Sequence, residues 1–310
     1  MNISYGSTLS LDGLAQLYEH RFMFLLLFLL FYVFVMLSDS LVVYIICSQR
    51  SLHRPMYVFV GAVLVNSVVG SSNLYPKLIW DLLEGIPVVL MSRSACLCQA
   101  YVSGFVGCAS FMLMAAMAID RYLSVCHPLR YAALMSPTVV TIMLIICWLA
   151  PAFIIAGVVA LASRLQPCHS RATRLFCDTY TIVSISCWGE ERFISEICGL
   201  FVTTILILIP IAFVLFSYTR ILVLCLQRSR TFASKALKTC LPHVIVFVNY
   251  SLSVMFELLH RRVTTSDEAR RTIATNVLVL VIPTVCNPVV YGLKVGEIYQ
   301  KLKKLLHCHR

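Results

Sequence analysis

Seven stretches of apolar residues recur along the chain, and each is long enough to cross a lipid bilayer. A helix needs about 20 apolar residues to span the hydrocarbon layer. The segments cover 22–47, 56–82, 97–122, 138–162, 197–224, 239–260 and 272–293. They predict an all-α membrane protein, folded as a bundle of seven transmembrane helices.

The composition agrees with a chain that folds in lipid. Apolar residues make up 60% of the 310 residues and charged residues only 13%, against about 25% charged in a typical soluble domain. The apolar segments leave no room for a second domain, so we expect a single unit over 1–310. It divides into an extracellular N-terminus (1–21), the helix bundle (22–293) and a cytoplasmic tail (294–310). The first 21 residues lack the basic cluster and cleavage site of a signal peptide, so we expect none to be removed.

The distribution of Lys and Arg sets the orientation, because cytosolic loops carry an excess of both. With the N-terminus outside, the cytosolic segments hold 14 of the 25 basic residues and two of the 14 acidic ones. These cations suit anionic lipid headgroups, while the basic stretch 220–238 also suits a polar or acidic partner protein. Composition does not separate the two interpretations, and no nucleic-acid partner is expected.

The tail carries its apolar residues on one helical face, with Ile298, Leu302, Leu305 and Leu306 opposite a run of lysines. This pattern predicts a short amphipathic helix on the membrane surface. Cys308, just beyond it, is a candidate for palmitoylation.

Five cysteines fall in the outer segments, where disulfides persist. Their pairing does not follow from sequence alone, and the odd number makes Cys98 the candidate for the unpaired one. No Cys/His cluster has metal-ligand spacing, so we expect neither a metal site nor a cofactor. The five are Cys96, Cys98, Cys168, Cys177 and Cys187.

The outer N-terminus also contains an N-glycosylation sequon, in which Asn2 is followed by Ile3 and Ser4. Such three-residue patterns arise often by chance, and the predicted topology is what favours modification of Asn2.

Four motifs occur in a fixed order along the chain. Residues 117–131 read MAIDRYLSVCHPLRY, which resembles the M-A-Y-D-R-Y-V-A-I-C-x-P-L-x-Y signature of the olfactory receptors. Residues 52–57 read LHRPMY, and residues 235–243 are similar to the K-A-x-x-T-C-x-x-H motif of that family. Residues 287–291 add NPVVY in the seventh segment. The resemblance covers essentially the entire chain and implies a rhodopsin-like G-protein-coupled receptor.

Several functional expectations follow from this resemblance. It implies a small odorant bound within the helix bundle and a heterotrimeric G protein of the stimulatory, olfactory type that raises cyclic AMP. It also implies a multi-pass protein of the plasma membrane, in an olfactory sensory neuron. The receptor would contact membrane lipid and have no enzymatic activity.

The adjacent Asp120 and Arg121 have a physical rationale of their own. An unpaired arginine near the membrane is costly, so Asp120 can neutralise it in the resting state. A helix rearrangement would then free the guanidinium to meet Tyr218, Tyr291 or a partner helix. Proline removes a backbone donor, which makes a point about which a helix can bend. The residues assigned to this activation switch are Asp120, Arg121, Tyr122, Pro210, Tyr218, His243, Asn287, Pro288 and Tyr291.

The resemblance implies two disulfides in the outer loops. One would join Cys96 to Cys177 and tether the second outer loop over the mouth of the bundle. The other would join Cys168 to Cys187 within that loop.

Two positions depart from the family pattern. Asp39 stands where the family usually has Asn in the first helix, and Ser67 stands where it usually has Asp in the second. A sodium ion held by a helix 2 carboxylate is therefore in doubt. Asp39 either takes over that role or is a neutral, hydrogen-bonded packing residue.

The ligand site is expected between the outer halves of the helices, where bundle pockets lie. Small residues there also serve close helix packing, which is the competing interpretation. Ser103 stands where amine receptors carry an aspartate, so a cationic amine is disfavoured. The candidate ligand-binding residues are Ser103, Gly104, Gly107, Cys108, Phe111, Val202, Thr203, Leu206, Ser251, Val254, Met255, Leu258, Val277 and Leu280.

Other functional classes find less support in the residues. The chain has none of the common hydrolase or phosphate-binding motifs, and acids within the membrane are limited essentially to Asp39. A transporter would show two related halves, and no internal repeat is present. A non-olfactory rhodopsin-like receptor for a peptide or lipid is the remaining alternative.

Overall fold

The computed structural model describes residues 8–263, 277, 281, 286–287, 289–291 and 300. Within these residues, six helical segments are long and apolar enough to cross a membrane, and they match the first six predicted spans. Of the seventh span, 272–293, the residues that are described are helical. The tail 294–310 with Cys308, apart from Gln300, and the sequon at Asn2 lie outside the described residues.

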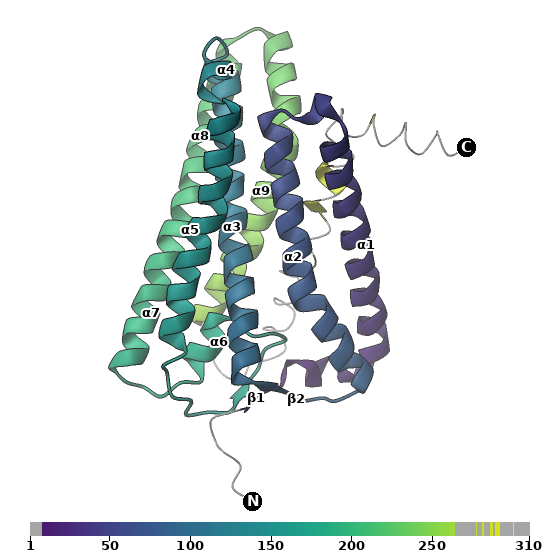
Figure 1. The fold of residues 1–310 in the computed structure, drawn as a ribbon, viewed down its shortest axis with the longest axis vertical. Helices are drawn as coiled ribbons and strands as arrows, with labels where there is room; N and C mark the ends of the chain where they lie inside the picture. The colour runs from purple at the N-terminus through teal and green to yellow at the C-terminus, as the bar shows by residue number, and fades with distance from the viewer. Residues whose placement is uncertain are drawn as a thin grey trace, which may run out of the picture.

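Four of the spans are single helices that run side by side along the molecule (Figure 1). Two of them begin with proline in the first turn, where the missing amide proton costs nothing. Ser92 and Ser136 cap two helices by accepting hydrogen bonds from backbone amides three residues on. The four helices are α1 (Arg21–Ser48), α2 (Pro55–Glu84), α3 (Arg93–Cys126) and α5 (Pro137–Ala162).

The fifth span is a continuous stack of three pieces. These are α7 (Glu190–Thr203), a π-helical turn η4 (Thr204–Leu208) and α8 (Ile209–Gln227). It begins at residue 190 rather than at the expected 197, because Glu190 and Glu191 are polar and escape an apolar count. Carboxylates in the first turn of a helix interact favourably with the positive end of the helix dipole. Glu190 and Glu191 therefore stabilise a helix that begins at residue 190.

The sixth span also begins earlier than expected. The helix α9 (Arg230–Val263) extends beyond the predicted start at residue 239. Residues 230–238 are largely polar, and we infer that this first part of α9 projects from the membrane. In the loops between spans lie the short helices η3 (Arg50–Leu52), α4 (Tyr131–Leu134) and α6 (Thr179–Ser184).

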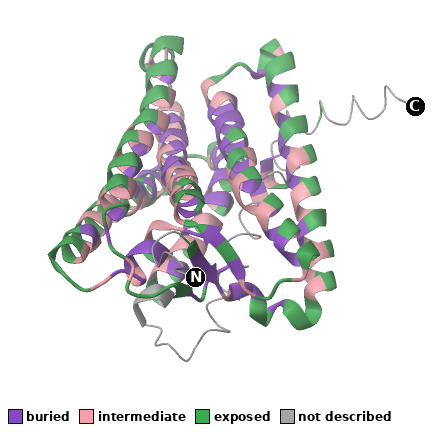
Figure 2. Cartoon of the chain, turned by 60° about the horizontal axis from the view of Figure 1, so that its bottom comes forward, coloured by how far each residue is buried: buried purple, intermediate pink, exposed green. Residues whose placement is uncertain are grey.

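A small three-stranded sheet, which the sequence analysis did not predict, closes the outer end of the bundle. The N-terminal strand β1 (Thr8–Leu11) lies between β2 (Val89–Ser92), to which it is antiparallel, and β3 (Arg171–Ala172), to which it is parallel. Two short helices, η1 (Gly13–Gln16) and η2 (Tyr18–His20), lead from β1 into α1. Leu9 and Leu11 are buried, and the sheet lies beneath the bundle in Figure 2. Residues 8–20 of the outer N-terminal segment are therefore part of the packed structure.

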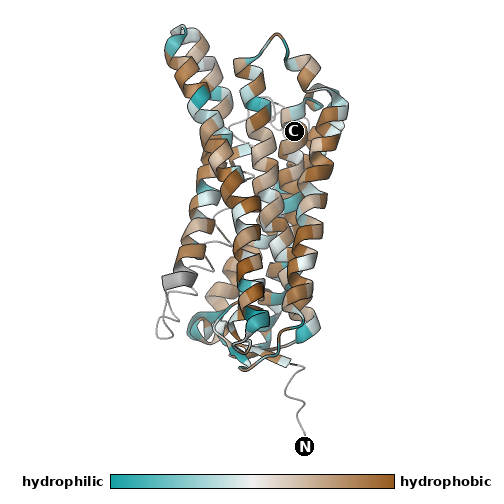
Figure 3. Cartoon of the chain, turned by 90° about the vertical axis from the view of Figure 1, so that its left-hand side faces the viewer, coloured by the Kyte–Doolittle hydropathy of each residue, from teal (hydrophilic) through white to brown (hydrophobic). Residues whose placement is uncertain are grey.

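The interior of the bundle is organised around α3, which contacts α2, α5, α8 and α9. Large apolar side chains such as Phe22, Leu37 and Phe153 are instead exposed on the outside of the bundle. The outer surface is apolar along most of its length, with hydrophilic residues gathered toward the ends (Figure 3). Such a surface is stable against lipid but not against water.

Candidate functional site

A cavity of about 760 Å³ lies between α2, α3, α5, α7 and α9, beneath the second outer loop. Its volume falls within the roughly 300–1,000 Å³ of typical small-molecule sites. Ten of the expected ligand-binding residues line it. They are Ser103, Gly104, Gly107, Cys108, Phe111, Val202, Thr203, Val254, Met255 and Leu258.

Glycines on α3 allow neighbouring helices to come close to it around the cavity. A Cβ atom at Gly104 would lie 3.1 Å from Cγ2 of Ile155 on α5. At Gly107 the backbone carbonyl accepts a hydrogen bond of 3.4 Å from the Tyr250 hydroxyl of α9. The Tyr250 ring packs against Phe111 with centroids 5.0 Å apart. The deep wall of the cavity is therefore an aromatic pair joining α3 to α9.

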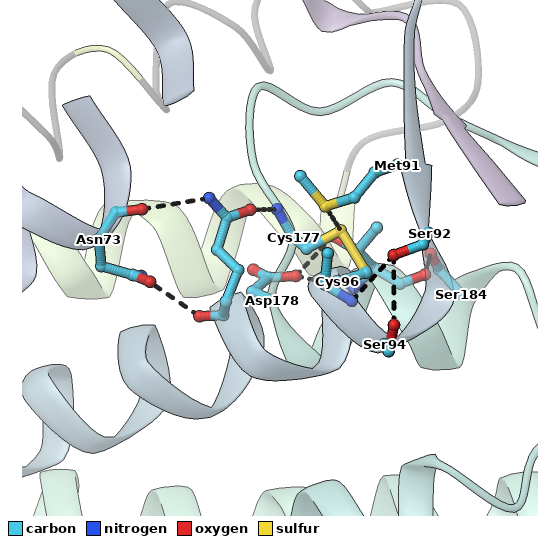
Figure 4. The surroundings of a disulfide bond; sticks show 11 residues. Asn73, Met91, Ser92, Ser94, Cys96, Cys177, Asp178 and Ser184 are labelled. Atoms are coloured by element: carbon cyan, nitrogen blue, oxygen red, sulfur yellow. Dashed lines mark hydrogen bonds between the residues drawn. A yellow bond between two sulfur atoms is a disulfide. The ribbon is translucent and has the colours of Figure 1, made fainter. Parts of the chain in front are cut away.

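The second outer loop forms a lid over the cavity, and a disulfide holds it to α3. Cys177 is bonded to Cys96, with Cα atoms 5.2 Å apart, and its backbone amide donates to Gln99 Oε1 at 2.8 Å. Figure 4 shows this disulfide between the loop and the start of α3. Asp178 then begins α6 by accepting from the Thr181 amide at 2.7 Å. These contacts hold the lid residues 176–184 at the mouth of the bundle.

A second disulfide closes the loop on itself, joining Cys168 to Cys187 with Cα atoms 4.8 Å apart. Both pairings are those that the family resemblance implied. Cys98, the residue expected to be unpaired, is a free and exposed cysteine.

An ion pair provides a further contact between the lid and α9. The Arg174 guanidinium lies 2.6 Å from the Glu257 carboxylate, and both side chains are buried. The same guanidinium stacks over the Tyr180 ring, 5.3 Å from its centroid. The lid is thus joined covalently to α3 and electrostatically to α9.

At the cytosolic end of α3, Asp120 holds two side chains. Its Oδ2 atom accepts from Arg121 Nε at 2.9 Å and from Arg121 Nη2 at 2.5 Å, while Oδ1 accepts from the Tyr131 hydroxyl at 2.6 Å. Asp120 is fully buried. Burial, and then the hydrogen bond to Asp120, raise the pKa of Tyr131 well above its usual range, so the phenol remains a donor. The expected Asp120–Arg121 charge pair is therefore present, and Tyr131 binds to the same carboxylate.

The aromatic switch residues lie close by. Tyr218 of α8 packs on a small cluster that includes Cys225 and Cys240. The His243 ring of α9 lies 5.7 Å from the Tyr291 ring, and both side chains are buried. The three helices α3, α8 and α9 thus pack together at the cytosolic end of the bundle.

The remaining switch residues are more dispersed. Pro210 is the second residue of α8, the helix that directly follows the π-helical turn. Asn287 lines the ligand cavity rather than the cytosolic cluster. Tyr122 packs on the edge of the cytosolic cluster, and Pro288 lies outside the described residues.

Comparison with known proteins identifies the family. A family model described as "Olfactory receptor" matches residues 28–309 of the chain. The chain belongs to the olfactory receptor family. This receptor is 28% identical to human olfactory receptor 11A1 over 297 residues, which are 95% of this chain and 92% of the relative. It is 31% identical to human olfactory receptor 6N1 over 293 residues, or 92% and 90% of the two chains. Mouse olfactory receptor 1E16 is 27% identical over 294 residues, or 94% and 91%.

The receptor is therefore a multi-pass membrane protein of the G-protein-coupled class, and its family is not enzymatic. Olfactory receptors as a group recognise odorants and couple to G proteins. The transporter and the non-olfactory receptor are set aside by a match that covers nearly the whole chain.

Three expected ligand-binding residues do not line the cavity of this receptor. Leu206 is buried in a packing cluster with Cys108 and Ile155. Ser251 is buried in α9, off the cavity wall, and Val277 packs against the outer core. Position relative to the sequence motifs assigned these residues to the cavity, but each of them is packed inside the protein instead. Leu280 lies outside the described residues.

The sequence analysis missed other residues that line the cavity, including Tyr250, Arg192, Glu196 and Glu257. Its statement that acids within the membrane are limited to Asp39 was wrong, since Glu257 and Asp81 are also buried within spans. A charged residue inside an apolar segment is itself a signal of function. That signal would have found Glu257.

Asp39 is completely buried, and its carboxylate interacts with the side chain of Ser67, the other departure from the family pattern. No group of three or more His, Cys, Asp or Glu side chains with the geometry to hold a metal ion occurs within the described part of the chain.

Proposed function

We propose that this receptor binds a small odorant in the cavity between α3, α7 and α9 and then activates a stimulatory, olfactory-type G protein, raising cyclic AMP. The proposed site of action is the plasma membrane of an olfactory sensory neuron. The proposed ligand contacts are the ten expected residues that line the cavity, together with Tyr250. The proposed switch is the Asp120–Arg121 pair, with Tyr122, Pro210, Tyr218, His243, Asn287, Pro288 and Tyr291.

One observation carries this proposal: the same two helices build both ends of the mechanism. At the outer end, α3 and α9 meet through Phe111 and Tyr250 on the cavity wall. At the cytosolic end, α3 carries the Asp120–Arg121 pair and α9 carries His243. A ligand that separates or draws together the two helices outside would therefore change the surroundings of Arg121 inside. Coupling of this kind requires only that the ligand bind the two arrangements unequally.

The test is a cyclic AMP assay in cells that express the receptor with an olfactory-type stimulatory G protein, challenged with a panel of odorants. Arg121→Ala removes the cation that the switch releases, so odorant responses should disappear although the protein still reaches the cell surface. Surface staining of an N-terminal epitope measures that delivery.

Arg50→Ala is the matched control, because Arg50 is an exposed cytosolic arginine in η3, away from the switch. It removes the same charge and should leave the response intact. A response that survives Arg121→Ala, or silence to every odorant from a receptor that is well expressed at the surface, would contradict the proposal.

A further inference from the structure

The described outer part of the ligand cavity is rich in strong hydrogen-bond acceptors. Three carboxylates contribute to it: Asp178 of the lid, Glu196 of α7 and Glu257 of α9. An ionised carboxylate accepts hydrogen bonds and donates none. Among the described lining residues, the single cation is Arg192.

Arg192 makes several contacts within the protein. Its Nε atom donates to Glu196 at 3.1 Å, and its Nη1 atom donates to the Ser186 carbonyl at 2.8 Å. The guanidinium also stacks on the Trp188 ring, 3.9 Å from its centroid. These contacts use two of the five N–H donors of Arg192 and fix the guanidinium beside Glu196.

Several hydroxyl groups of this region also donate their proton within the protein. A serine or threonine has one proton to donate, and three lining hydroxyls give theirs to their own helix backbone. Ser184 donates to Thr181 O at 2.9 Å, Ser195 to Glu191 O at 2.9 Å, and Thr203 to Gly199 O at 2.8 Å. Only their lone pairs remain for a ligand.

The opposite wall of the cavity contains a buried hydroxyl group. Ser71 of α2 lines the cavity with 1% of the residue exposed, and its hydroxyl has no partner among the described residues. A buried hydroxyl without a partner costs free energy. A polar molecule inside the cavity would relieve that cost.

Glu257 is the lining carboxylate most sheltered from water, with 5% of the residue exposed. The ion pair with Arg174, at 2.6 Å, holds its Oε1 atom. A carboxylate can accept about four hydrogen bonds, so it can receive a ligand proton without losing the arginine. A hydrogen bond to a charged acceptor is also roughly twice as strong as one between neutral groups.

We propose that the receptor selects apolar molecules whose single polar group donates a hydrogen bond, a hydroxyl or an ammonium, and that Glu257 receives that bond. The selection rests on the proposed odorant site and names its ligand class. Aldehydes and ketones offer only an acceptor to Glu257, and a carboxylate ligand offers only an acceptor that also carries a negative charge. The selection also revises the sequence-based expectation, drawn from Ser103, that an amine is disfavoured.

The test compares four head groups on one carbon skeleton: 1-octanol, octylamine, octanal and octanoate, with matching cyclohexyl and phenyl series. Because the skeleton is constant within a series, differences in potency report the head group. In the cyclic AMP assay the alcohol and the amine should be at least about tenfold more potent than the aldehyde, the ratio expected for one hydrogen bond to a charged group. The carboxylate should be the weakest.

Glu257→Gln should reduce the alcohol-over-aldehyde ratio to about threefold or less, because the amide carbonyl is a neutral acceptor. Arg174→Gln is the matched control: it breaks the same ion pair and leaves the Glu257 carboxylate, so it should keep the ratio. The exchange variant, Arg174→Glu with Glu257→Arg, retains an ion pair but places the donor in the cavity wall. It should invert the preference toward octanal and octanoate.

The outcomes separate this inference from the function on which it rests. Responses that depend on Arg121 but are equally sensitive to all four head groups would overturn the inference alone, as would an unchanged ratio in Glu257→Gln. If Glu257→Gln and Arg174→Gln lower the alcohol-over-aldehyde ratio equally, the selectivity depends on the ion pair and not on Glu257 as an acceptor. Silence of the surface-expressed receptor to every series would overturn the proposed function and the inference together.

Discussion

Tyr131 restrains the arginine switch through a single hydrogen bond, from its hydroxyl to Asp120 at 2.6 Å. The bond orients the buried carboxylate that holds Arg121. A hydrogen bond to a charged group contributes about 1.5–3 kcal/mol. Tyr131→Phe should therefore weaken the resting state and raise ligand-independent cyclic AMP several-fold, measured per receptor at the cell surface. Tyr44→Phe, at an exposed position in α1, should leave the basal signal unchanged.

The Tyr131 bond should also be insensitive to pH in the physiological range. The pKa of Tyr131 is raised above its ordinary value of about 10. A raised folded-state pKa means that the stabilisation is fully present below the unfolded pKa and declines as pH rises through the folded one. Between pH 6 and pH 8 the effect of Tyr131→Phe should thus stay constant. If the basal signal of Tyr131→Phe equals that of the wild type at every pH, Tyr131 does not restrain Arg121.

Two buried acids show how the setting of a residue decides its role. Glu257 reaches the guanidinium of Arg174, which lies 83 positions earlier in the sequence. Asp39 is equally deep, but its carboxylate interacts with the neutral side chain of Ser67. The periodicity of the apolar segments treats both as interruptions of a helix. Only the folded loop distinguishes them, because it brings Arg174 to one and not to the other.

Among the elements, β1 ties the N-terminal segment to both outer loops. The Ser10 amide donates to the Ser170 carbonyl at 2.7 Å in the middle of the sheet. Ser10→Pro removes this donor from a central strand, where proline is not tolerated. Loss of the bond should cost about 1–3 kcal/mol and lower the melting temperature of the purified receptor by roughly 3 °C or more. A thiol-reactive dye that labels buried cysteines such as Cys147 and Cys240 on unfolding measures it.

Thr8→Pro provides the comparison for β1, because proline is accepted at the first residue of a strand and Thr8 is exposed. It should melt close to the wild-type temperature. Equal melting temperatures for Ser10→Pro and the wild type would mean that β1 does not stabilise the outer end.

The helices were predictable because lipid imposes a length and an apolar character on every span. The expected end at residue 162 and the end of α5 coincide. Helix ends that extend beyond the membrane, as at Glu190 and Arg230, were less predictable. Polar residues continue the helix there without an apolar pattern. The sheet escaped prediction because β1 is only four residues long and pairs with residues some 80 and 160 positions away. Position relative to the motifs predicted the α3 face of the cavity, but it could not predict Glu257, whose role depends on the second outer loop.

For the molecule as a whole, the link between the outer cavity and the cytosolic switch must be reciprocal. If a ligand in the cavity favours G-protein binding, the bound G protein must strengthen ligand binding by the same factor, typically about 5- to 150-fold. In membranes with the G protein, a guanine nucleotide that releases it should therefore shift agonist competition curves to weaker affinity by such a factor. Arg121→Ala should abolish the shift and keep the weaker affinity, because the cavity lies at the opposite end of α3 from Arg121. A full shift in Arg121→Ala would mean that the coupling bypasses the arginine switch.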